Sequence, residues 1–489
     1  MPAFHHRPSR PAQGLAAVLV CALVLTVGPL GLTSCRQRGG TVLPPVLRAG
    51  SGHDAVMAVG PFINLRTFDW LDASRAYGWG DVTGTDAVYF TLGPGGASRA
   101  VAFPVADQLA HAFPLPGGAG CAGVHYADFT AWVHPLEGKP FLLGEACRVF
   151  LSPSGTRLLT FSSLGKPLAY DTSTWAGTPQ DEIWVAEFPY SGCMVSWVTD
   201  DLIVVRDRAG QELSGRLKLV REPEGRLVAV IDGAGDSLSP FPSPDGRWLA
   251  VLVTDPAAAL NPPEGVFPLD AGREIRVYRV SDLTEGGGAA AVIPLGAPAA
   301  GLSLTGLVWS PDGTRLAYSE IAVTLSGSLP DPNQVTYGEA GRVFVATGPA
   351  FAPASIPIGS DGAWLPARFS PAGSRLFIED VRTGRALIWE AAAGATVEVG
   401  FRAFCRQWLD ESLILGSSRE AASEGRPLLV EAATGKASDP GWPGYDWIAS
   451  PDGKRVAIRV AVGAGEDLRP FGKVAAGDWL VIYQVAGEP

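Results

Sequence analysis

Residues 310–317 read Ser-Pro-Asp-Gly-Thr-Arg-Leu-Ala, and this stretch decides the fold. In a tight strand reversal, proline holds φ at about −65° at the first corner, aspartate suits the second corner, and glycine takes the positive φ that follows. The residues directly after the turn, Arg315-Leu-Ala-Tyr-Ser319, are of the type that forms strands. The stretch therefore predicts a β-hairpin.

The same spelling occurs five times along the chain, at residues 152–159, 243–250, 310–317, 370–377 and 450–457. The first and fourth copies carry Ser154 and Ala372 in place of the aspartate. One such turn would be weak evidence, but five turns with the same strand pattern behind them indicate a tandem repeat.

The spacing of the copies indicates further units between them. The prolines of successive copies are 91, 67, 60 and 80 residues apart. Two of these gaps are close to twice a unit of about 42 residues, which is typical of a four-stranded blade. A second spelling, with Trp before the turn and Asp within it, fills those gaps at Trp197–Asp200 and Trp408–Asp410 and recurs at Trp70–Asp72. We therefore expect eight units, which begin near residues 70, 153, 199, 244, 311, 371, 409 and 451.

Almost no stretch of the chain has a sustained helical period, so the fold class is predicted to be all-β. The Ser-Pro-Asp-Gly hairpins resemble the repeats of TolB-like β-propellers, which are relatives of WD-repeat propellers, and the resemblance covers about residues 65–489. It implies a single β-propeller of about eight four-stranded blades, with seven as the alternative. The motif is specific for the fold and says little about function.

Three segments need separate treatment in this scheme. The last unit shows only three strands, so we expect an N-terminal strand near Asp54–Val59 to close the last blade, which also protects the edge of the ring. Pro256–Asp270 and Leu325–Glu339 are interpreted as insertions. The divergent segment at about 105–145 is either an excursion between blades or a degenerate part of a blade.

The N-terminus has the pattern of a secretory signal: basic Arg7 and Arg10, then the apolar run Gly14–Val27. The residues that follow, Leu32-Thr-Ser-Cys35, resemble a bacterial lipobox. In that family the Cys thiol is joined to a diacylglycerol and the chain is cut just before it, which implies lipidation of Cys35. We expect residues 1–34 to be a lipoprotein signal peptide that is removed, 35–50 a lipid-anchored linker, and 51–489 the propeller. The alternative is an ordinary signal peptide that contains a cysteine.

Composition excludes several classes of protein. The chain has 489 residues, a formal net charge of −11 and 47% hydrophobic residues, which is too much apolar material for an intrinsically disordered protein. An acidic chain is repelled by phosphate, so no nucleic-acid partner is expected. After the leader, no apolar run approaches the roughly 18 residues that a membrane-spanning helix needs.

Four cysteines remain once Cys21 leaves with the signal and Cys35 serves as the anchor. They are candidates for disulfides, because the protein is expected to fold in an oxidising compartment. Three pairings are open; the local one joins the first two and leaves the last two to each other. The candidates are Cys121, Cys147, Cys193 and Cys405. No C-x-x-C pair occurs, which argues against a zinc cluster or a redox dithiol.

No residue is predicted to be catalytic. Propeller hydrolases of the prolyl oligopeptidase type carry a G-x-S-x-G nucleophile elbow, whereas the nearest string here, Gly301–Gly306, has the wrong spacing. A hydrolase domain would also need on the order of 200 further residues, for which the repeats leave no room. The sequence therefore argues against a serine peptidase, and whether the chain has another activity stays open.

Neither a metal nor another cofactor is expected. His111, His125 and His134 share the divergent segment with Asp128, Glu137 and Cys121. His125 and His134 are nine positions apart, which suits no common helical or hairpin pair of metal ligands, so we interpret these residues as ordinary loop or core histidines.

Three sets of repeated side chains could suggest ligand sites, and each also has a structural interpretation, which we favour. The turn acids satisfy the turn itself. The tryptophans pack in blade cores instead of binding sugars. The arginines that follow the turns form ion pairs or hydrogen bonds at blade edges instead of a shared ligand site. These residues are Asp245, Asp312 and Asp452; Trp197 and Trp408; and Arg157, Arg315, Arg375 and Arg455.

The sequence thus leads to a cell-envelope lipoprotein that is held to the membrane through Cys35 and is monomeric and extracytoplasmic in a bacterium. Its propeller is expected to bind or scaffold envelope proteins or peptides without catalysis, and the insertions are the expected recognition surface. One alternative is a propeller hydrolase or lyase with a channel-bound metal, and another is a lipoprotein that senses a solute or signal.

Overall fold

The structure is a computed structural model that describes residues 44–485 apart from short gaps. The gaps are 50–54, 83–85, 94–99, 105–108, 116–119, 126–128, 136–139, 147, 162–166, 173–183, 186–194, 210–211, 222–224, 234–236, 255–272, 297–301, 305, 326–334, 338–340, 360, 401–402, 419–425 and 445. The described residues belong to one compact unit, Val42–Pro489. The predicted signal peptide and Cys35 lie outside them.

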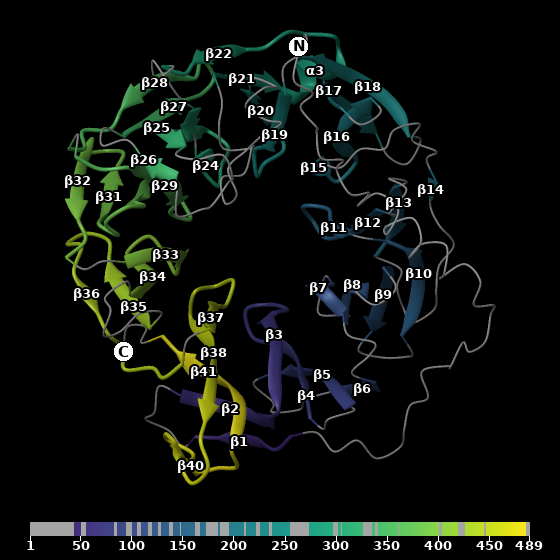
Figure 1. Ribbon diagram of the computed structural model, residues 1–489, viewed down its shortest axis with the longest axis vertical. Coiled ribbons are helices and arrows are strands. Elements are labelled where there is room, and N and C mark those ends of the chain that lie inside the picture. Colours follow the sequence, from purple (N-terminus) through teal and green to yellow (C-terminus); the bar gives the residue numbers. More distant parts are fainter. Residues whose placement is uncertain are drawn as a thin grey trace, which may run out of the picture. The chain divides into compact units, whose positions relative to one another are not determined.

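The described part of this unit contains nine antiparallel sheets of four or more strands, which form a single β-propeller, and one two-stranded sheet. We number the sheets as blades 1–9 in chain order of their inner strands, which lie nearest the axis in Figure 1. The described residues contain one short helix, α3 (Val280–Thr284), next to the third strand of blade 5. The predicted all-β class is confirmed.

The first five blades have four strands each, ordered from the inner edge outward. Blade 1 is β3 (Asn64–Trp70), β4 (Ala76–Asp81), β5 (Asp86–Leu92) and β6 (Ala100–Pro104). Blade 2 is β7 (Leu109–Pro114), β8 (Gly120–His125), β9 (Thr130–Pro135) and β10 (Phe141–Glu145). Blade 3 is β11 (Arg148–Leu151), β12 (Arg157–Phe161), β13 (Pro167–Asp171) and β14 (Trp184–Val185). Blade 4 is β15 (Val195–Thr199), β16 (Leu202–Ala209), β17 (Glu212–Arg221) and β18 (Arg226–Asp232). Blade 5 is β19 (Ser237–Pro242), β20 (Trp248–Thr254), β21 (Glu274–Arg279) and β22 (Ala291–Pro294).

The last four blades include two enlarged ones. Blade 6 is β24 (Val308–Trp309), β25 (Arg315–Leu325), β27 (Arg342–Thr347) and β28 (Ala352–Ser355), and the far end of β25 also pairs with β23 (Leu302–Leu304) and β26 (Val335–Tyr337). Blade 7 is β29 (Trp364–Phe369), β30 (Arg375–Asp380), β31 (Ala386–Glu390) and β32 (Ala395–Glu398). Blade 8 is β33 (Ala403–Trp408), β34 (Leu413–Ser418), β35 (Pro427–Glu431) and β36 (Ala437–Ser438). Blade 9 is β37 (Asp446–Ala449), β38 (Arg455–Val462), β41 (Gly477–Gln484), β2 (Ala55–Phe62) and β1 (Val46–Arg48).

The predicted number of blades, eight with seven as the alternative, is wrong. The additional sheet is blade 2, which is formed by the segment 105–145 that the sequence left as an excursion or a degenerate blade. The sequence between β7 and β8 reads Leu-Pro-Gly-Gly-Ala at residues 115–119 and carries neither repeat motif. A count of turn spellings therefore missed it, although its four strands pair in the same order as those of its neighbours.

The ring is closed by strands from both ends of the described chain. β2 pairs antiparallel with β41, with Ala58 opposite Val481, and β1 adds a fifth strand on the outside of β2. Figure 1 shows these N-terminal strands beside β38 and β41. The predicted closure by an N-terminal strand is confirmed. Because β1 starts at Val46, the sheet begins inside the segment 35–50 that was predicted to be linker.

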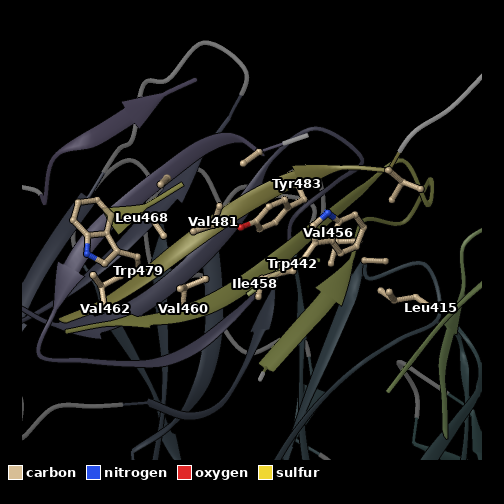
Figure 2. Packing of buried hydrophobic residues seen from close by; sticks show 14 of the residues in the cluster. Leu415, Trp442, Val456, Ile458, Val460, Val462, Leu468, Trp479, Val481 and Tyr483 are labelled. Carbon is tan, nitrogen blue, oxygen red and sulfur yellow. The ribbon is translucent and has the colours of Figure 1, made fainter. Parts of the chain in front are cut away.

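Apolar layers hold the blades together, and the layer on blade 9 shows how they are built. Alternate residues of β38, such as Val456, Ile458 and Val460, face the same way as Val481 and Tyr483 of β41 (Figure 2). All of them are buried. A side chain of this size contributes about 1.5–3 kcal/mol when it is fully buried, so each sheet needs a neighbouring sheet to cover its face.

The Ser-Pro-x-Gly hairpins have the predicted geometry in all five copies. In each, the glycine amide donates to the serine carbonyl at 2.8–3.0 Å, and the glycine φ lies between +66° and +73°. A side chain at Gly453 would also collide, since its Cβ would lie 2.0 Å from the Leu409 carbonyl oxygen of blade 8.

Gly453→Ala is therefore expected to lower the free energy of unfolding by about 2–3 kcal/mol, from backbone strain together with the clash. Gly465 is the matched control, because its φ is +81° but nothing lies within 4 Å of an added Cβ. Gly465→Ala should cost only about 1 kcal/mol. Denaturant unfolding of both variants measures the difference, and equal losses would contradict the role of the contact between blades.

Candidate functional site

The turn acids serve the turns, as predicted. In Asp245, Asp312 and Asp452, Oδ1 accepts a bond of 2.6 Å from the serine hydroxyl that begins the turn. The same oxygen accepts the backbone amide two residues further on, at 3.1–3.2 Å. Burial would raise the pKa of Asp245 and of Asp312, but these hydrogen bonds and a nearby arginine outweigh it and lower the pKa of both.

The arginines that follow the turns reach from one blade to the next. Nη1 of Arg315 donates to the Gly373 carbonyl at 2.6 Å. Arg375 and Arg455 repeat this contact at 2.5 Å and 2.7 Å, to the carbonyls of Glu411 and Ala73. The predicted hydrogen-bonding role at the blade edge is confirmed at these three positions. Arg157 interacts electrostatically with Asp200 of the next blade.

The tryptophans before the turns make the complementary contact, in the opposite direction around the ring. Trp197 and Trp408 are only 7% and 5% exposed, which confirms that they pack in blade cores. At four blades, the indole Nε1 of the tryptophan before the turn donates to a carbonyl on the inner strand of the preceding blade. The sequence analysis did not predict these hydrogen bonds. The four bonds are Trp70 to Ile448 (3.0 Å), Trp197 to Phe150 (3.3 Å), Trp309 to Phe241 (2.9 Å) and Trp408 to Arg368 (3.1 Å). We call these arginine and tryptophan contacts the interblade latches.

A variant that removes one latch donor should be measurably less stable. Trp408→Phe keeps most of the packing and leaves the Arg368 carbonyl without its donor, so we expect a loss of about 1–2 kcal/mol in denaturant unfolding. Trp197→Phe should lose less, because its bond is longer at 3.3 Å. The reverse order would argue against the hydrogen bond as the cause.

The junction of blades 1 and 2 is built differently, from polar aromatic side chains. Cys121 and His134 lie opposite each other on β8 and β9, and His125 and Trp132 share their face of the hairpin. Tyr77, Trp79 and Tyr89 cover this face from β4 and β5. The ring centroids of His125 and Trp132 are 5.2 Å apart, and those of Trp79 and His134 are 6.3 Å apart. We call these seven side chains the junction cluster.

The junction cluster brings two of the three histidines together. The spacing of nine predicts no pair of metal ligands, and the His125 and His134 rings lie on one face of the hairpin with centroids 6.3 Å apart. Both side chains are buried, at 6% and 1% exposure, which confirms the interpretation as core histidines. Asp128, Glu137 and the side chain of His111 lie outside the described part of the structure. Within the described ranges, no group of three or more His, Cys, Asp and Glu could hold a metal ion.

Burial sets the protonation states in this cluster. It lowers the pKa of His134 to about 3, and the neighbouring His125 acts in the same direction. Burial also raises the pKa of Cys121 to about 12, against the opposing effect of the nearby Tyr89 side chain. A protonated thiol and a neutral imidazole are poor partners for nucleophilic catalysis, so the arrangement is suited to packing.

The structure describes only one of the four candidate disulfide cysteines fully. Cys121 is a free, buried thiol that faces blade 1, so it forms no disulfide in the structure, and this holds for the local option with Cys147 as for the other two pairings left open. Cys147 and Cys193 lie outside the described residues, as does the side chain of Cys405 in β33. Their role as disulfide candidates stays a prediction.

Antiparallel strands divide the connections of every blade between two faces of the ring. The turns between first and second strands lie on one side, which we call the turn face. The connections between second and third strands lie on the other side, together with the links from blade to blade; we call it the insertion face. Leu325–Glu339 joins β25 to β27 and so belongs to the insertion face, as does the hairpin of β39 (Asp467–Leu468) and β40 (Gly472–Lys473). Pro256–Asp270 lies outside the described residues, between β20 and β21.

Within the described part of the chain, no helix has both the length and the apolar character that are needed to cross a bilayer.

Comparison with known proteins adds weak structural likenesses. No protein-family model and no curated protein matches the chain. Among solved structures, the C-terminal WD40 domain of Sif2 matches with 10% identity and a TM-score of 0.42, over 88% of this chain and 97% of that one. The dihydro-heme d1 dehydrogenase NirN, in complex with DHE, matches with 16% identity and a TM-score of 0.42, over 76% and 72%. Hsv2 of Kluyveromyces lactis matches with 11% identity and a TM-score of 0.37, over 68% and 96%.

Proposed function

We propose that this protein is a membrane-anchored lipoprotein of the bacterial cell envelope, whose propeller binds or scaffolds protein or peptide partners without catalysis. The chain acts as an extracytoplasmic monomer and is tethered through lipidated Cys35.

The observation that carries this proposal is the repeated latch between blades. At four junctions an indole donates to the preceding inner strand, and arginines join neighbouring turn regions. The side chains that could have formed a ring of ligands thus hold the scaffold together. A rigid ring with variable connections on one face is the usual arrangement of a binding module.

The cellular location rests on sequence patterns. The lipobox-like Leu32–Cys35 supports lipidation, and the Ser-Pro-Asp-Gly hairpins resemble those of TolB-like envelope proteins. Intact-mass measurement of protein from the producing bacterium tests the anchor. We expect a chain that begins at an acylated Cys35; a retained leader or an unmodified Cys35 would contradict it.

The binding role is tested by a pull-down from envelope extract, with the mature chain lacking residues 1–34 as bait. One partner in stoichiometric amount is the expected result. Recovery of no protein would contradict the proposal and favour a small ligand. Metal analysis of the same preparation tests the alternative, because a stoichiometric divalent ion would support a hydrolase or lyase with a channel-bound metal.

A further inference from the structure

Two large apolar side chains are exposed on the insertion face of adjacent blades. Ile63 is 64% exposed and lies in the link from β2 to β3. Phe129 is 52% exposed and lies in the connection between β8 and β9. Both connections belong to the insertion face, and blades 1 and 2 are neighbours in the ring (Figure 1).

Phe129 has an unfavourable backbone conformation, and burial of its side chain does not offset the conformational energy. Its φ is +53°, in the left-handed region that is unfavourable for a bulky residue. Phe351 also has a positive φ, +47°, but it is 1% exposed and packs edge-on against Trp248 and Trp309. The strain at Phe351 is offset inside the protein. The strain at Phe129 instead holds an aromatic ring half in water, which suits a contact with something outside the chain.

The N-terminal tether reaches the propeller on this same face. The Pro45 carbonyl accepts a hydrogen bond from the Gly60 amide, near the end of β2 that leads to Ile63. Gly60 precedes the exposed Ile63 by three positions. Pro45, which is bonded to Gly60, therefore lies on the insertion face near this isoleucine.

The length of the tether then limits which face can meet the membrane. Cys35 and Pro45 are ten positions apart, so the segment between them spans at most about 35 Å. The eight-residue strand β38 is about 26 Å long, which approximates the height of a blade. To put the turn face on the bilayer, the tether would first have to run the height of the blade and use most of its reach. No such detour is needed for the insertion face.

We propose that the insertion face near blades 1, 2 and 9 lies on the lipid surface, with Ile63 and Phe129 in the bilayer interface. The turn face then points away from the membrane and is free for a partner. This inference rests on the proposed lipid anchor. An apolar residue and an aromatic residue beside a covalent lipid are a combination that stabilises contact with an interface.

The test is photocrosslinking of the acylated mature protein in vesicles of phosphatidylethanolamine and phosphatidylglycerol. Benzoylphenylalanine is placed at Ile63 or at Phe129, and at Lys454 as the matched control, which is exposed on the turn face of blade 9. We expect lipid adducts at 63 and 129 at least tenfold more abundant than at 454. Equal labelling, or labelling only at 454, would overturn the proposed orientation.

Two further measurements keep the outcomes distinct. Thermal unfolding midpoints equal to that of the wild type show that each variant is folded; all three positions are exposed. Intact mass shows whether Cys35 is acylated. If it is not, the proposed anchor fails, whereas acylated protein without adducts at 63 and 129 contradicts only the orientation.

Discussion

Asp478→Ala is expected to lower the free energy of unfolding by about 3–5 kcal/mol, because it removes a buried carboxylate and leaves the partly buried Arg459 without its ion-pair partner. Oδ2 of Asp478 accepts from Nη2 of Arg459 at 2.6 Å and from the Leu65 amide at 2.9 Å. Nη2 of Arg459 also donates to the Asn64 side chain at 3.0 Å. These contacts join β38 and β41 to the first strand of blade 1, where the two ends of the propeller meet, so their loss also loosens ring closure.

Asp232→Ala is the matched control for this loss. Arg216 and Asp232 form an ion pair of 3.2 Å in which both side chains are 56% exposed. Solvent screens such a pair, so its removal should cost less than about 1 kcal/mol. Urea unfolding of both variants at neutral pH gives the comparison. Similar losses would mean that the Asp478 contacts add nothing beyond an ordinary surface pair.

Acidification should destabilise the protein through His134 before the carboxylates titrate. Burial holds the pKa of this imidazole at about 3 in the folded chain, against its ordinary value of 6.5. As the pH falls below 6.5, the unfolded chain therefore takes up the proton first. The contribution of neutral His134 is fully present above pH 6.5 and is lost at about 1.4 kcal/mol per pH unit until the pH nears 3. Between pH 6.5 and 4.5 we expect a loss of about 2–3 kcal/mol.

His134→Phe tests the origin of this slope, since phenylalanine retains a ring between the blades and does not titrate. Its unfolding free energy should vary less between pH 6.5 and 4.5 than that of the wild type. Asp69 affects the pH dependence in the opposite direction, because burial raises its pKa in the folded chain. The folded chain therefore takes up this proton before the unfolded chain does, and Asp69 makes the protein more stable as the pH falls. A variant that keeps the full slope of the wild type would show that other groups cause the acid sensitivity.

Hairpins could be predicted from sequence because their cause is local. Proline and glycine restrict or permit φ by their own covalent structure, and the serine and aspartate bond to amides within five residues. The same five residues therefore form the same turn wherever they occur. The role of the aspartates followed from this, and so did the burial of the tryptophans, which occupy the position before a turn.

Blade 2 was not predicted because the sequence between its strands carries neither of the two repeated turn motifs. The only indications were two short apolar runs, Gly120–His125 and Thr130–Pro135, separated by four residues. Such runs identify a hairpin only once neighbouring sheets are known to cover both faces. The junction cluster was missed for the same reason, since Tyr77 and Cys121 are distant in sequence.

By itself the amino-acid sequence determined the all-β class, the repeated hairpins and the need for an N-terminal strand to complete the last blade, because each depends on backbone preferences within a few residues or on an unpaired sheet edge. Only the tertiary structure decided that there are nine blades, that Trp and Arg donors join one blade to the next, and that His134 is buried as a neutral ring. These features depend on which distant strands lie face to face, and that is set by the packing of the whole ring.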